Sequence, residues 1–61
     1  MVDPADELAL VEYVARQMVD LLGADAVPRL YEQAEVAERI ADTFSARTWL
    51  DIAGRAKDLI R

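Results

Sequence analysis

The residues with the clearest chemical potential are carboxylates in the middle of the chain. Glu35, Glu38 and Asp42 are spaced by three and four positions, with Glu32 just before them, so on a helix they would share one side. Carboxylates placed in this way can bind a metal ion, but such a site also needs histidine or a facing pair of acids. The chain has no histidine. The pattern therefore favours a solvated acidic face that holds neither a metal nor another cofactor.

Catalysis has few candidate groups in this sequence. Cysteine and histidine are both absent, which removes common nucleophiles and bases as well as every Cys/His zinc site. The two glycines stand alone at Gly23 and Gly54, so no glycine-rich loop could hold a phosphate. Because no nucleophile, base and orienting group come together, we expect a protein that is not an enzyme.

The charge of the chain is acidic and unevenly distributed. Twelve acids and seven bases give a net charge of −5, and residues 1–42 contain ten of those acids but three of the bases. The bases that follow are Arg47, Arg55, Lys57 and Arg61. They would spread around a helix instead of gathering at its N-terminal half, where a helix–turn–helix protein reads bases. Since phosphates and anionic lipids repel an acidic protein, we expect neither a nucleic-acid nor a membrane partner.

The expected cellular compartment is inferred from three features that the sequence does not contain. No apolar stretch approaches the roughly 20 residues that cross a bilayer. The first residues, MVDPADE, are acidic, unlike the positive start of a signal peptide. The absence of cysteine fits a reducing compartment, so we expect a cytoplasmic protein.

Hydrophobic spacing predicts three helices in a single domain over residues 1–61. The first spans about 4–22, after a capping Asp3 and before Gly23. Its apolar residues recur at three and four positions: Leu8, Val11, Ala15, Met18 and Leu22.

The second helix is predicted over about 26–40, after a capping Asp25. Its apolar stripe would allow another helix to approach closely, because three of its members are alanines: Val27, Leu30, Ala34, Ala37 and Ala41. The boundary that follows stays open. Asp42 could cap a third helix over about 43–60, but one continuous helix from 26 to 60 is the alternative. We prefer the break because such a helix would far exceed the usual length, and the fold class is then all-α, a small three-helix bundle.

The only tryptophan lies at the centre of the apolar face of the third helix. Trp49 shares that face with Ile52, Ala53, Ala56, Leu59 and Ile60. We therefore expect Trp49 to anchor the core by packing against both other helices. On the polar faces, ion pairs four positions apart are expected to support the helices: Glu12 with Arg16, Glu35 with Arg39, and Asp51 with Arg55.

The first helix carries more apolar surface than one bundle contact uses. Leu10, Val14 and Leu21 form a second stripe beside the first. One interpretation makes this helix the central one, covered by both others. The other makes the second stripe a self-association surface. A chain this short, without disulfides or metals, has marginal stability, which favours a homodimer through the first helix.

The turns and the tryptophan motif resemble short uncharacterised bacterial proteins, of the kind common in proteobacteria, that have no assigned function. Their pattern has an amphipathic helix, a Gly-Asp turn, a second helix, another Gly-Asp turn and a last helix with Thr-Trp-x-x-Ile-Ala. Thr48-Trp49-x-x-Ile52-Ala53 matches that motif. Leu22 stands where the pattern has histidine, and Ala41 where it has glycine. The resemblance implies three helices and supplies no function.

Two functions fit these observations. The first is a non-enzymatic helical protein–protein interaction module that binds itself as a homodimer, with another protein as a further partner. The alternative is an acidic regulator or inhibitor of the nucleic-acid mimic type, which would bind a basic surface of a larger protein through Glu32, Glu35, Glu38 and Asp42. Salt discriminates them, because binding through the acids should weaken steeply with ionic strength and apolar contacts should not.

The dimer can be tested at the middle of the second stripe. Val14→Glu should dissociate the dimer, because it places a charge in an apolar contact, and should lower thermal stability in a concentration-dependent way. Sedimentation equilibrium measures the mass. A monomer mass for the unmutated protein at tens of micromolar would contradict the prediction.

Overall fold

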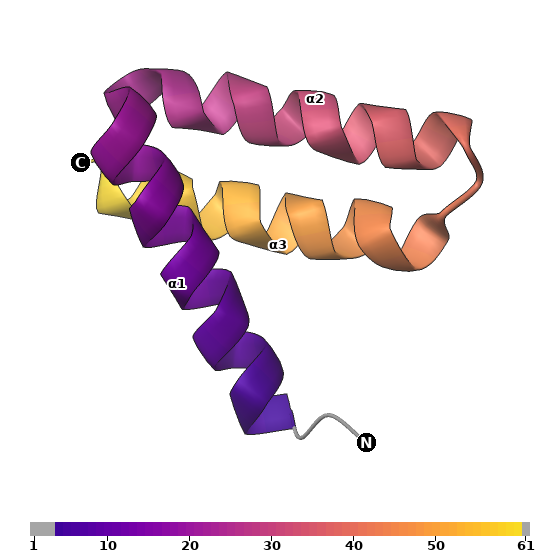
Figure 1. Ribbon diagram of the computed structural model, residues 1–61, viewed down its shortest axis with the longest axis horizontal. Coiled ribbons are helices and arrows are strands. Elements are labelled where there is room, and N and C mark those ends of the chain that lie inside the picture. Colours follow the sequence, from indigo (N-terminus) through magenta and orange to yellow (C-terminus); the bar gives the residue numbers. More distant parts are fainter. Residues whose placement is uncertain (1–3, 61) are drawn as a thin grey trace.

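The computed structural model describes residues 4–60, which form helices joined by short turns (Figure 1). α1 spans Pro4–Leu22, a 3₁₀ turn follows at Gly23–Asp25, α2 spans Ala26–Arg39 and α3 spans Thr43–Leu59. This range contains no strand, so the all-α class is confirmed, and the helix bounds agree with the spacing of apolar residues. Asp3, the expected cap of the first helix, lies outside the described residues. None of the described helices is long and apolar enough to cross a membrane.

The helices are arranged as a hairpin with a crossing arm. α2 and α3 run antiparallel and make the largest helix–helix contact, while α1 crosses α3 obliquely and touches α2 much less (Figure 1). The first half of α1 extends beyond the α2–α3 pair. The interpretation that made α1 the central helix is therefore wrong. α3 is central, because both other helices pack against it.

The turn between α1 and α2 depends on a glycine. Gly23 has a φ of +59°, a left-handed conformation that costs a residue without Cβ little. Asp25 occupies the position before α2, but its side chain makes no capping hydrogen bond, contrary to expectation. The 3₁₀ turn leads directly into α2, and the Ala26 N–H donates to the Gly23 carbonyl instead.

The break between α2 and α3 is confirmed, and it forms without glycine. Ala41 has a φ of +60°. The Asp42 N–H donates to the Ala37 carbonyl at 2.9 Å, and the Ala41 N–H donates to the Glu38 carbonyl at 3.0 Å. This pair of bonds is the Schellman ending of a helix, whose left-handed position normally holds glycine. Asp42 then caps α3, since its Oδ1 accepts the Ser45 N–H at 3.1 Å.

The core is built mainly from alanine. Seven of the nine buried apolar residues among the described side chains are alanines, and Leu30 and Ile52 are the other two. The alanines come chiefly from α2 and α3: Ala15, Ala26, Ala34, Ala37, Ala46, Ala53 and Ala56. Small side chains let α2 and α3 approach closely, as the sequence predicted, but they also limit how much apolar area the fold can bury.

Replacing Ala41 with glycine should stabilise the protein. A left-handed alanine is strained by its Cβ, and Ala41→Gly removes that strain, for an expected gain of about 1 kcal/mol. In a domain of this size that gain raises the melting temperature by roughly 4–8 °C, which circular dichroism at fixed protein concentration can measure. The control is Ala24→Gly, since alanine 24 is exposed and has a negative φ. Equal effects of the two changes would contradict this explanation.

Candidate interaction surface

Large apolar side chains lie on the outside of this fold. Ten of them are exposed among the described residues: Leu8, Leu10, Tyr13, Leu21, Leu22, Tyr31, Val36, Ile40, Phe44 and Leu50. Soluble monomers expose single apolar residues routinely, but contiguous patches mark places where something binds.

The second apolar stripe of α1 is largely uncovered. Leu10 is 53% exposed and Leu21 is 77% exposed. Val14, between them, is half-buried and packs against the core cluster. The fold thus leaves two of the three predicted interface residues in solvent at the two ends of the stripe.

A groove adjoins this stripe, between α1 and the first half of α3. Its volume is about 240 Å³, and the residues lining it include no charged side chain. They are Leu10, Val14, Phe44, Ser45, Thr48, Trp49 and Ile52. Phe44 is 74% exposed at its edge. The hydroxyl of Thr48 donates to the Phe44 carbonyl at 3.1 Å, so its proton is already used within α3.

Trp49 packs at the edge of the core. It is half-buried against a cluster of five residues, namely Ala15, Leu30, Ile52, Ala53 and Ala56. Trp49 was predicted to be the central core residue, but the largest fully buried side chain is Leu30. Trp49 therefore packs against the core cluster and also lines the groove.

An ion pair holds α1 against α3 at the crossing. The Arg55 guanidinium donates from Nε and Nη2 to the two carboxylate oxygens of Glu12, the second bond measuring 3.0 Å. Arg16 donates to Glu12 Oε1 at 2.9 Å. The hydrogen bond from Arg55, with a smaller contribution from Arg16, lowers the pKa of Glu12 to about 2. Within residues 6–60, this is the one polar side-chain contact between different helices.

The expected pairing within helices needs one correction. Glu12 with Arg16 and Glu35 with Arg39 form as predicted, but Arg55 pairs with Glu12 on α1 instead of Asp51 on its own helix. Arg55 was predicted to lie on the solvent-facing side of α3. It instead contacts α1 through Glu12.

A second hollow lies on the other side of α1. Its volume is about 600 Å³ and its lining mixes acids with apolar side chains: Glu7, Leu8, Val11, Asp51, Arg55 and Asp58. Leu8 was predicted to face the core but is 71% exposed, because the first half of α1 extends beyond the α2–α3 pair.

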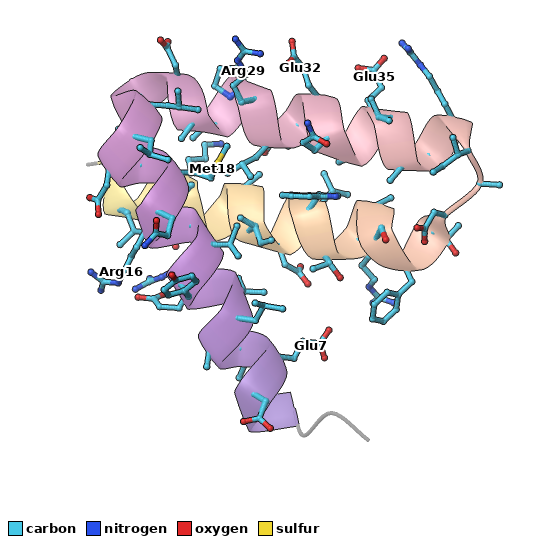
Figure 2. All side chains as sticks on the ribbon, viewed as in Figure 1. Glu7, Arg16, Met18, Arg29, Glu32 and Glu35 are labelled. Atoms are coloured by element: carbon cyan, nitrogen blue, oxygen red, sulfur yellow. The ribbon has the colours of Figure 1, made fainter. Side chains whose placement is uncertain are left out.

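The four predicted acids do not form one free acidic face, because three of them interact with nearby residues of the same chain. Glu32 and Glu35 project from α2 on the side away from α3 (Figure 2), where Glu35 pairs with Arg39 at 3.0 Å and Glu32 approaches Arg29 at 3.8 Å. Glu38 is exposed too. The carboxylate of Asp42, however, is committed to the cap of α3, and the hydrogen bond from Ser45 lowers the pKa of Asp42. In the part of the chain that the structure describes, no three acidic residues are grouped so that they could hold a metal ion.

Comparison with protein-family models, with characterised proteins and with solved structures finds no match for this chain. The resemblance carried by the Thr48–Ala53 motif therefore stays a prediction. Function has to be inferred from the surface itself, which is apolar and uncharged at the groove.

Sequence reasoning missed two features of this surface, one apolar side chain and one ion pair. Phe44 was assigned no role, although Phe44, Thr48 and Ile52 recur every fourth position and so form a second stripe beside that of Trp49. The Glu12–Arg55 pair joins residues 43 positions apart, and no local spacing rule connects them.

The ion pair at the crossing predicts a specific acid sensitivity. Because the pKa of Glu12 falls from 4.5 to about 2 on folding, the ionised pair stabilises the fold above about pH 4.5, and this contribution is lost as the pH falls toward 2. Glu12→Gln should therefore melt below the unmutated protein at pH 6, and the difference should shrink as both are acidified. Glu35→Gln breaks an exposed pair within α2 and should change the melting temperature little. A gap between Glu12→Gln and the unmutated protein that stays constant from pH 6 to pH 2 would contradict this role.

Proposed function

We propose that this protein is a non-enzymatic, helix-mediated protein–protein interaction module that acts as a homodimer through α1. The observation that carries the proposal is the amount of large apolar side chain on the surface of a fold whose fully buried residues are mostly alanine. Leu10, Leu21 and Phe44 are more than half exposed. A second copy that covers these side chains supplies the apolar burial that a single copy lacks.

The stripe on α1 has the spacing of a helix-pairing seam. Leu10, Val14, Gln17 and Leu21 are separated by four, three and four positions, the repeat that keeps side chains facing a partner helix. The seam is about 16 Å long and contains no charged residue. Because a two-fold contact brings the same patch together from both copies, α1 needs no other surface to be its own partner.

The acidic regulator has weaker support. Two of its four carboxylates already lie beside arginines of the same helix, Glu32 by Arg29 and Glu35 by Arg39. A third, Asp42, serves as a helix cap. A basic partner would have to displace the arginines before it met these acids.

Dimerisation is best tested at Leu21, because most of its side chain is exposed to solvent. At tens of micromolar, sedimentation equilibrium should give the unmutated protein about twice its monomer mass. Leu21→Glu should give the monomer mass, because it places a charge in the apolar seam without removing a core contact. The matched control is Leu8→Glu, since Leu8 is about as exposed but lines the acidic hollow, and it should stay dimeric.

Two results would overturn the proposed function. One is a monomer mass for the unmutated protein. The other is equal dissociation by Leu21→Glu and Leu8→Glu, which would place the effect in added charge and not in the seam. Far-ultraviolet circular dichroism checks that each variant keeps its helices.

A further inference from the structure

We propose that Met18 is a redox-sensitive site: oxidation of its thioether by hydrogen peroxide weakens the packing of α1 on the α2–α3 hairpin and so destabilises the fold. The chain has two methionines, Met1 and Met18, and only Met18 lies within the described residues 4–60. The site is independent of the proposed homodimer, because Met18 does not belong to the α1 seam.

Met18 lies where α1 meets the hairpin (Figure 2). It packs against the core cluster, which joins Ala15 of α1 to Leu30 of α2 and to three residues of α3. The other partly buried α1 side chains that pack there are valines, so Met18 brings the largest apolar side chain that α1 adds to this contact. A change in the chemistry of Met18 therefore acts where α1 is held.

A small oxidant can reach Met18 in the folded chain. The side chain is half-buried and not enclosed, and oxidation of sulfur side chains follows their exposure. A lone pair of the thioether sulfur attacks one oxygen of hydrogen peroxide, so that an S–O bond forms as the O–O bond breaks. The sulfur gives up two electrons to become a sulfoxide, and the second oxygen leaves as water.

The sulfoxide does not fit the surroundings of Met18. All five residues of the core cluster are apolar, and no polar or charged side chain is buried among the described residues. A sulfoxide that stayed in place would have a polar oxygen without a hydrogen-bond donor from the cluster, which is costly. A sulfoxide that turned to solvent would take the side chain away from the cluster. Both responses weaken the contact between α1 and the hairpin.

The polar contact of α1 does not compensate for this loss. Glu12–Arg55 is the one polar side-chain contact between helices within residues 6–60. Met18 lies six residues after Glu12, about 9 Å further along the helix and nearer to the turn at Gly23. The ion pair holds the middle of α1, whereas the last turns of α1 depend on apolar packing.

Peroxide treatment of the folded protein tests the site. Without denaturant, mass spectrometry of proteolytic fragments should find one added oxygen on Met18. At fixed protein concentration, circular dichroism should then show a melting temperature lowered by at least roughly 4–8 °C. Trp49 emission should shift to longer wavelength, because Trp49 packs on the same cluster. Methionine sulfoxide reductases should restore both signals.

Met18→Leu is the matched control, because it keeps an apolar side chain of similar volume, removes the sulfur and leaves Met1 in the chain. Peroxide should not change its melting temperature. A loss confined to the unmutated protein supports the site. Equal losses in the two proteins overturn it, since Met1 or another residue would then be the cause. Met18 that stays reduced while Met1 is oxidised, or that is oxidised without a change in melting temperature, also overturns it.

Discussion

The packing of α2 against α3 through alanine is the constraint on which the rest of this structure depends. Alanine brings two helix backbones close together, but each one contributes little apolar area. Leu30 and Ile52 are the only larger side chains in the buried set of the described residues. Larger side chains such as Met18, Trp49 and Leu59 pack against this core while only partly buried, and others, such as Leu21 and Phe44, lie mostly in solvent. In the proposed dimer, a contact between molecules would cover the exposed ones.

The angle of α1 decides how that outer surface is shaped. Gly23 turns the chain at one end of α1, and the Glu12–Arg55 pair links the middle of α1 to the C-terminal half of α3. The first half of α1 then extends past the hairpin. This overhang creates two different hollows, an uncharged one that contains Trp49 and a larger one edged by acids.

The proposed dimer would link stability to interaction. A small chain without cysteine or histidine has no disulfide or zinc ligand of these types to compensate for a small core. In the proposed dimer, the side chains that recognise the partner are the same ones that complete the core. Such a protein would fold and associate together, and its apparent stability would depend on its concentration.

The sequence by itself determined the all-α class, the bounds of the first helix and most of the buried face of α3, and it favoured the break between α2 and α3 without excluding one continuous helix. These features follow from local spacing, because apolar residues three and four positions apart must share a side of a helix. It also pointed to Asp42 as the cap of α3 and to Leu10 and Leu21 as surplus apolar surface. Only the tertiary structure decided that α3 is the central helix, that Arg55 reaches Glu12, that Leu8 projects into solvent and that Trp49 lies at the core's edge. The physical reason is that helical periodicity specifies which side of a helix is apolar, whereas the angle between helices depends on side-chain size and on contacts between residues far apart in the chain.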